Sequence, residues 1–96
     1  MSNREAYKQK IEAELELIHA KTLEFKAHAK IAVADARIQA QGTIQDLEQK
    51  MAQTKERLAE LNASSDDAWE SIKSGVEKAW GDLRTAFGDA KERFKK

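Results

Sequence analysis

Apolar residues recur every three or four positions over the first two thirds of the chain. The series starts at Tyr7 and continues with the spacing typical of a coiled-coil seam: Ile11, Leu15, Ile18, Thr22, Phe25 and Ala29. It continues as Val33, Ala36, Ala40, Ile44, Leu47, Met51, Thr54, Leu58 and Leu61. Two successive steps of four, from Ala36 to Ile44, locally unwind a supercoil. The pattern predicts one long helix over about residues 3–62.

A glycine inside this series leaves one alternative open. Gln41, Gly42 and Thr43, followed by Asp46, could end one helix and begin another. The apolar spacing nevertheless passes through Gly42 without a change of phase, which favours a continuous helix despite a cost of about 1 kcal/mol for the glycine. A break at Gly42 would instead produce a compact three-helix monomer.

A polar segment follows the apolar series and marks a helix boundary. Asn62 can end one helix, and Ser64 or Ser65 can cap the next. We therefore expect a turn at residues 62–66 and a second helix over about residues 66–95. The fold class predicted for the whole chain is all-α, a single helical-hairpin domain with one long and one short helix.

The second helix contains a repeat of eleven residues, which is almost three helical turns. The pattern Ala-Trp-x-x-Ile-x-x-Gly-Val at residues 68–76 returns as Ala-Trp-x-x-Leu-x-x-Ala-Phe at residues 79–87. Its bulky residues therefore share one face: Trp69, Ile72, Val76, Trp80, Leu83, Phe87 and Phe94. We expect this face to form the intrachain hairpin core with five residues of the long helix: Ile44, Leu47, Met51, Leu58 and Leu61.

The two predicted helices differ in length. At 1.5 Å per residue the long helix would measure about 90 Å and the short one about 46 Å. Folded back, the short helix covers only residues 33–62, and the first part of the seam has no partner in its own chain. The simplest closed assembly is an antiparallel homodimer with its two-fold axis near Ala32 and a three-helix bundle at each end. The predicted oligomer interface comprises Tyr7, Ile11, Leu15, Ile18, Thr22, Phe25, Ala29, Ala32, Val33 and Ala36. A lone hairpin and a larger assembly are the alternatives.

Composition narrows the class of protein. The 96 residues include no proline and no cysteine, which favours long helices and excludes disulfides and thiolate metal sites. Seventeen basic and seventeen acidic residues balance, so the chain lacks the basic footprint of a nucleic-acid-binding protein. No apolar run approaches the roughly 18 residues of a membrane span, and the N-terminus does not resemble a signal peptide. We expect a cytoplasmic protein.

Two pairs of residues suggest a metal site. Glu16 and His19 match the Glu-x-x-His step of di-iron bundles, and Glu24 and His28 could share a surface ion. The first pair flanks the apolar seam instead of pointing along it, and the further inward glutamates of such bundles are missing. The sequence also has no nucleophile motif and no glycine-rich phosphate loop. We therefore predict no metal site, no cofactor and no enzymatic activity.

Two functional hypotheses follow. The first is a structural or protein-interaction coiled-coil protein that forms a homo-oligomeric helical bundle and has itself as its partner. The alternative is reversible binding to a membrane or lipid surface, because Lys73, Arg84 and Lys91 flank one side of the bulky face of the second helix. Zero net charge over that helix and small residues on its other flank argue against strong lipid affinity.

Two segments carry a resemblance to a known group. Residues 5–15 (EAYKQKIEAEL) and 58–70 (LAELNASSDDAWE), with Gly-Val-Glu-Lys-Ala-Trp at residues 75–80, resemble small, uncharacterised bacterial coiled-coil proteins. The resemblance covers nearly the whole chain and implies a bacterial cytosolic protein without assigned chemistry. The eleven-residue repeat is also similar to that of late-embryogenesis-type stress proteins, which adds an adaptor or stress-related role to the first hypothesis.

Overall fold

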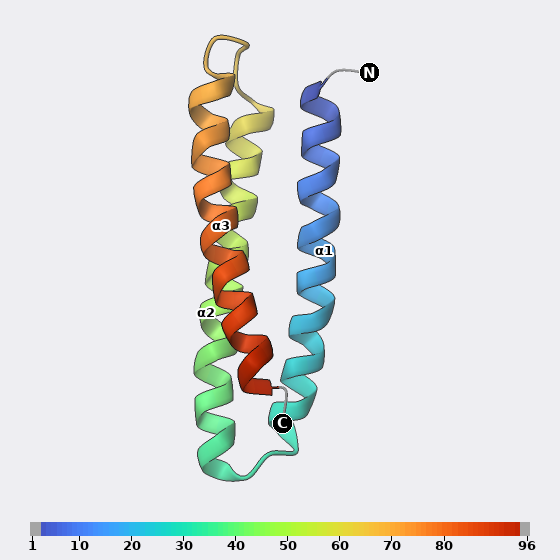
Figure 1. Cartoon of the computed structure of the whole chain (residues 1–96), viewed down its shortest axis with the longest axis vertical. Coiled ribbons are helices and arrows are strands. Elements are labelled where there is room, and N and C mark those ends of the chain that lie inside the picture. The colour runs from blue at the N-terminus through green and yellow to red at the C-terminus, as the bar shows by residue number, and fades with distance from the viewer. Residues whose placement is uncertain (1–2, 95–96) are drawn as a thin grey trace.

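The computed structural model describes residues 3–94, which form three helices and no strand. They are α1 (Asn3–Lys30), α2 (Ala34–Asn62) and α3 (Trp69–Phe94). Figure 1 shows α1 and α3 running in one direction and α2 running in the other. The predicted all-α class is confirmed. The predicted extension of the last helix to Lys95 lies outside the described residues.

The single helix predicted over residues 3–62 is wrong, because the chain turns back at residues 31–33, here called the bend. The amides of Ile31 and Ala32 donate to the carbonyls of His28 and Ala29 at 3.2 and 3.3 Å and close the last turn of α1. Val33 then adopts an extended conformation, with φ −65° and ψ 161°, and precedes α2. The bend lets α1 pack on its own chain, without the entropic cost of recruiting a second one.

Gly42 lies inside α2 with a negative φ, so the helix is continuous there, as its apolar spacing predicts. The chain does form a compact three-helix unit, but it bends about ten residues earlier. The three helices have 28, 29 and 26 residues and cover one another over most of their length in a body of 51 × 21 × 18 Å. The length mismatch on which the antiparallel dimer was based is therefore absent.

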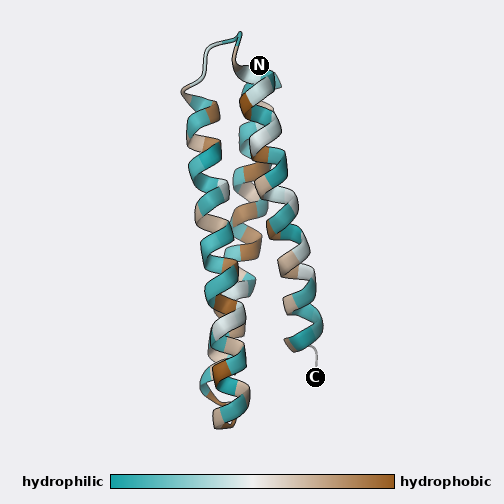
Figure 2. Cartoon of the chain, turned by 90° about the vertical axis from the view of Figure 1, so that its left-hand side faces the viewer, coloured by the Kyte–Doolittle hydropathy of each residue, from teal (hydrophilic) through white to brown (hydrophobic). Residues whose placement is uncertain are grey.

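The core runs along the axis of the bundle and receives one face of each helix. The apolar positions recur along all three ribbons in Figure 2. Buried residues of α1 are Ile11, Leu15, Ile18, Thr22, Phe25 and Ala29. Buried residues of α2 are Ala40, Ile44, Leu47, Met51, Thr54, Leu58 and Leu61, and those of α3 are Val76, Leu83 and Ala90. The Thr22 and Thr54 hydroxyls donate to the carbonyls of Ile18 and Lys50, so neither buried hydroxyl lacks a partner.

The bulky face of α3 closes the bundle against both other helices. Its remaining predicted core residues are partly buried against the central cluster: Trp69, Ile72, Trp80, Phe87 and Phe94. Phe25 of α1 stacks on Phe94 with ring centroids 4.5 Å apart and planes 7° apart, and it lies 6.0 Å from Phe87. These aromatic contacts tie the C-terminal end of α3 to α1.

Most residues of the predicted oligomer interface lie inside the bundle of the single chain. Seven of its ten residues, from Tyr7 to Ala29 in the series, lie in or against the core of their own chain. Only the last three lie at the bend, where Ala32 is partly buried and Val33 and Ala36 are exposed. The seam of α1 that was expected to need a second chain is covered by α2 and α3.

Candidate interaction surface

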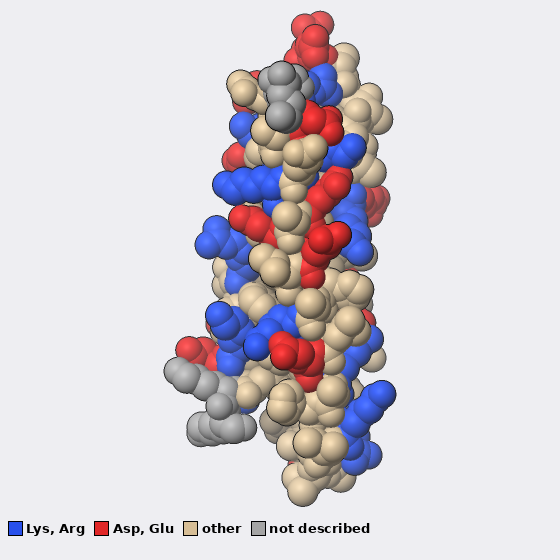
Figure 3. Space-filling model, turned by 90° about the vertical axis from the view of Figure 1, so that its right-hand side faces the viewer, with Lys and Arg blue, Asp and Glu red and all other residues tan. Residues whose placement is uncertain are grey.

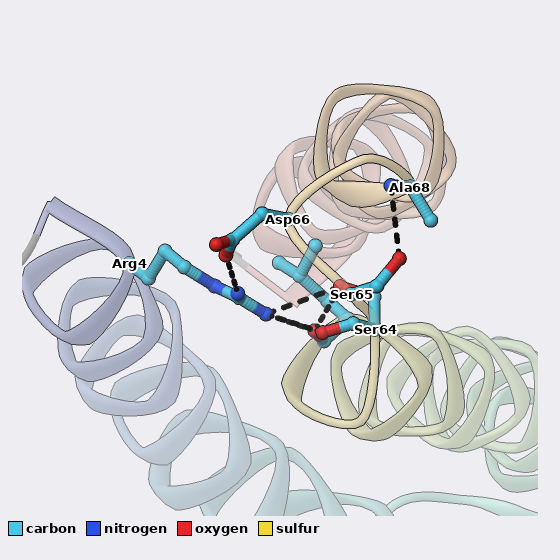
Figure 4. Close-up of polar contacts among 6 residues, drawn as sticks. Arg4, Ser64, Ser65, Asp66 and Ala68 are labelled. Atoms are coloured by element: carbon cyan, nitrogen blue, oxygen red, sulfur yellow. Dashed lines mark hydrogen bonds and ion pairs between the residues drawn. The ribbon is translucent and has the colours of Figure 1, made fainter.

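The two ends of the bundle are built differently. At the end where α2 turns into α3, Arg4 reaches across from α1 (Figure 4). Its Nη1 donates to Asp66 Oδ1 at 2.7 Å, and its Nη2 donates to the carbonyls of Ser64 and Leu61 at 2.8 and 3.3 Å. The guanidinium also lies 4.6 Å from the Trp69 ring centroid. Arg4 thus donates to one carbonyl in the last turn of α2, that of Leu61, and to one in the turn that follows, that of Ser64.

The serines predicted to lie in this turn also make local hydrogen bonds. Ser64 Oγ donates to the carbonyl of Leu61 at 2.7 Å, and Ser65 Oγ accepts from the amide of Ala68 at 3.3 Å. The Ser65 contact satisfies an amide just before α3 begins, in the manner of a helix N-cap. This end of the molecule is therefore closed by side chains of the chain itself.

Tyr7 lies three residues after Arg4 on α1, and its pKa is raised. Its ring meets Trp69 edge to face at 6.0 Å, and Lys73 Nζ lies 5.0 Å from the ring centroid. The hydroxyl is buried and makes no hydrogen bond to the described residues. Burial raises the pKa of Tyr7 above its ordinary value of 10.0, and the negative charge of Glu77 raises that pKa further.

The opposite end, where α1 turns into α2, exposes large apolar side chains. Ile31 is 84% exposed, Val33 77% and Ile38 68%. Figure 3 shows the lower end of the molecule as mainly uncharged surface, with basic side chains along one edge. We call this surface the α1–α2 end.

A groove of about 440 Å³ lies at the same end of the bundle, and Ala32 between Ile31 and Val33 is part of its lining. Its lining includes four alanines together with the polar residues His28, Gln39 and Thr43; the alanines are Ala29, Ala32, Ala36 and Ala40. Phe94, Glu92 and Arg93 border it, where the described part of α3 ends beside the last turn of α1 and the first turns of α2. This groove and the three exposed apolar residues therefore lie at the same end of the bundle.

The polar contacts of the bend are few and exposed. Val33 makes no side-chain capping hydrogen bond to α2, although it occupies the N-cap position. Arg37 Nη2 donates to the carbonyls of Ala32 and Lys30 at 3.2 and 3.5 Å, in exposed contacts. The Arg37 amide donates to the carbonyl of Val33 at 2.8 Å, which is the first turn of α2.

The residues considered for metal binding lie on the surface of α1. Glu16, His19, Glu24 and His28 are all exposed, and Glu24 pairs with Lys21 at 3.1 Å. Within residues 3–94, no three side chains of the metal-binding types are placed to share an ion. Over the same residues, no helix has the length and apolar character to cross a membrane.

The face of α3 considered for lipid binding is occupied inside the bundle. Its aromatic residues pack against the core, and two of the lysines that flank it also contact aromatic rings. Lys73 lies over Tyr7, and Lys91 Nζ lies 5.7 Å from the Phe87 ring centroid. A lipid surface would have to displace α1 to reach this face.

No protein-family model, no curated protein and no solved structure matches this chain. The resemblance to small bacterial coiled-coil proteins therefore stays a prediction. What the structure does describe at the α1–α2 end is a set of exposed large apolar side chains beside a groove.

Proposed function

We propose that this chain is a structural, self-associating helical protein that binds a second copy at its α1–α2 end and performs no catalysis. The observation that supports it best is the exposure of Ile31, Val33 and Ile38, each more than two-thirds exposed within eight residues of sequence. Large apolar residues exposed this close together in a chain are typical of interaction sites, whereas single scattered ones are not. An adaptor or stress-related role would use the same property.

The charge distribution supports a second copy as the partner. Residues 27–40 contain only three charged residues, Lys30, Asp35 and Arg37. Few charges therefore lose water when two such ends meet. The chain as a whole has a formal net charge of zero, so two copies do not repel each other at long range.

The shape of the α1–α2 end supports the same partner. A two-fold interface brings the same surface of both subunits together, so that surface must be complementary to itself. Here the projecting Ile31 and Val33 lie beside the alanine-lined groove of about 440 Å³. Each copy thus offers both an apolar projection and a hollow for the other.

Light scattering coupled to size-exclusion chromatography tests the proposal. Over a concentration series we expect the mass to rise from 10.8 kDa toward twice that value. A mass of 10.8 kDa at every concentration would overturn the proposal.

Surface variants locate the interface. Val33→Asp combined with Ala36→Glu places carboxylates on exposed positions of the α1–α2 end and should abolish the dimer. Leu17→Glu is the matched control, because Leu17 is 72% exposed but lies on α1 away from the bend. Equal loss of dimer in both variants would show that the dimer interface is not at the α1–α2 end. Circular dichroism checks that each variant is folded.

The lipid-surface hypothesis stays a prediction and is not proposed here as a second function, because the face of α3 that it needs packs on α1 and α2. Flotation with anionic vesicles tests it directly. Co-flotation of the folded protein would restore that hypothesis.

A further inference from the structure

We propose that two copies associate by exchanging α1. The bend at residues 31–33 straightens, residues 3–62 become one helix, and each α1 packs on α2 and α3 of the other chain. This inference rests on the proposed self-association, and it replaces contact between two closed bundles at the α1–α2 end with an exchange of helices at that end. Three observations support it: the composition of the bend, the spacing of apolar residues through the bend, and the contacts that α1 makes with α2 and α3.

The composition of the bend does not require a turn. Its residues are Ile31, Ala32 and Val33, without glycine or proline, and no residue within 3–94 has a positive φ. Val33 already has a helical φ of −65°, and only its ψ of 161° departs from the helical value of about −42°. No side chain caps α2. The bend is therefore held mainly by the packing of α1, which a second chain can supply equally well.

The apolar spacing of the core runs through the bend without interruption. Ala29, Val33, Ala36 and Ala40 follow one another at steps of four, three and four, which is one face of a straight helix. Ala29 and Ala40 are 5% and 9% exposed, whereas Val33 and Ala36 between them are exposed. A loop does not require the helical spacing of apolar residues that continues through residues 29–40. In a straight helix all four residues face the same way, and they are small enough for two such helices to cross closely.

Exchange preserves the contacts of α1. In the exchanged dimer, Phe25 meets Phe87 and Phe94 of the other chain, and Arg4 meets the other α2–α3 turn, with the geometry that each chain now has internally. The two states then differ only at the bend and in the number of chains. The straight form adds helical hydrogen bonds and buries Val33 and Ala36, which favours the dimer. Because two chains combine to form the dimer, the protein concentration sets the balance between monomer and dimer.

Ala34→Pro tests whether the helix straightens. Ala34 is the first residue of α2, where proline is well accepted, and the extended conformation of Val33 before it suits a following proline. In a straight helix the same proline removes the hydrogen bond to the carbonyl of Lys30 and clashes with the preceding turn.

We expect Ala34→Pro to keep the helix content and melting temperature of the monomer. With one proline per chain, the dissociation constant of the dimer should rise about 10,000-fold. Ala34→Ser is the matched control and should change that constant only slightly. If wild type and Ala34→Pro dimerise equally, self-association stands and exchange is refuted. If wild type is monomeric throughout, the proposed function itself fails.

Cross-linking reports which chain supplies α1. Lys26 Nζ of α1 and Glu48 Oε2 of α2 lie 2.6 Å apart, and the chain has no cysteine of its own. The double variant K26C/E48C, treated with a short bismaleimide, should link two chains in the dimer fraction and one chain to itself in the monomer fraction. The single variant K26C measures chance links. A dimer fraction with links only within chains refutes exchange.

Two substitutions on α2 separate exchange from end-to-end docking of unopened bundles. Ile38 lies about 200° around a helix from Ala36. In a straight helix Ala36 therefore faces the long helix of the other chain, and Ile38 faces away from it. Exchange predicts that Ala36→Glu disrupts the dimer and that Ile38→Glu does not. Docking of the exposed end predicts that both disrupt it, and that result would refute exchange.

Discussion

Arg4 joins α1 to the α2–α3 turn, and Arg4→Ala should lower the free energy of unfolding by about 2 kcal/mol. The variant loses two donated bonds to backbone carbonyls, worth about 0.5–1.5 kcal/mol each. It also loses the contact with Trp69, worth about 0.5–1 kcal/mol near the surface. The ion pair adds little, because the Asp66 side chain is 93% exposed. Partial exposure of Arg4 brings the sum down to about 2 kcal/mol.

Urea unfolding at a concentration that keeps the protein monomeric measures this loss. In thermal unfolding, the same loss should lower the melting temperature by about 8–15 °C for a chain of this size. Arg4→Lys should lose most of the same free energy, because an ammonium cannot donate to both carbonyls and Asp66 in one fixed geometry. Asp66→Asn should cost less than about 0.5 kcal/mol, and exposed Lys10→Ala should cost nothing measurable. The reasoning is refuted if Asp66→Asn destabilises the protein as much as Arg4→Ala.

Three further substitutions test the packing. Gly42→Ala should stabilise the protein by about 0.5–1 kcal/mol in urea unfolding, because an added Cβ meets nothing within 4 Å; a loss of stability would contradict the open space around it. Phe25→Ala should cost about 3–5 kcal/mol, since it removes a buried ring that stacks on Phe94; a cost below 1 kcal/mol would contradict the core assignment. Tyr7→Phe removes a buried hydroxyl without a partner and should gain up to about 1 kcal/mol at pH 8. Because burial raises the pKa of Tyr7 in the folded state, wild type should lose stability relative to Tyr7→Phe as the pH rises above about 10, and parallel curves from pH 8 to 11 would contradict this.

Much of the fold follows from local features of the sequence. The spacing of apolar residues predicts helices throughout, and the polar turn after Leu61 has the serines that the structure uses there. The bulky face predicted for the last helix, which is α3 in the structure, lies against the core from Trp69 to Phe94. These features depend on periodicity and capping, which are properties of short segments.

The bend could not be predicted in the same way, because no local signal demands it. Ile31 and Val33 are β-branched and slightly weaken a helix, but tertiary packing decides where the chain turns. The role of Arg4 was missed for a similar reason, since its partners lie about 60 residues away in the chain.

The distance between residues 26 and 48 within one chain tests the exchange of α1 most directly. Spin labels on K26C/E48C, diluted with unlabelled protein, report this distance separately in the monomer and dimer fractions. The monomer should show a short distance, because the native side chains meet at 2.6 Å. The dimer should show about 33 Å, which is 22 residues of straight helix at 1.5 Å each. A dimer fraction that keeps only the short distance would contradict the account.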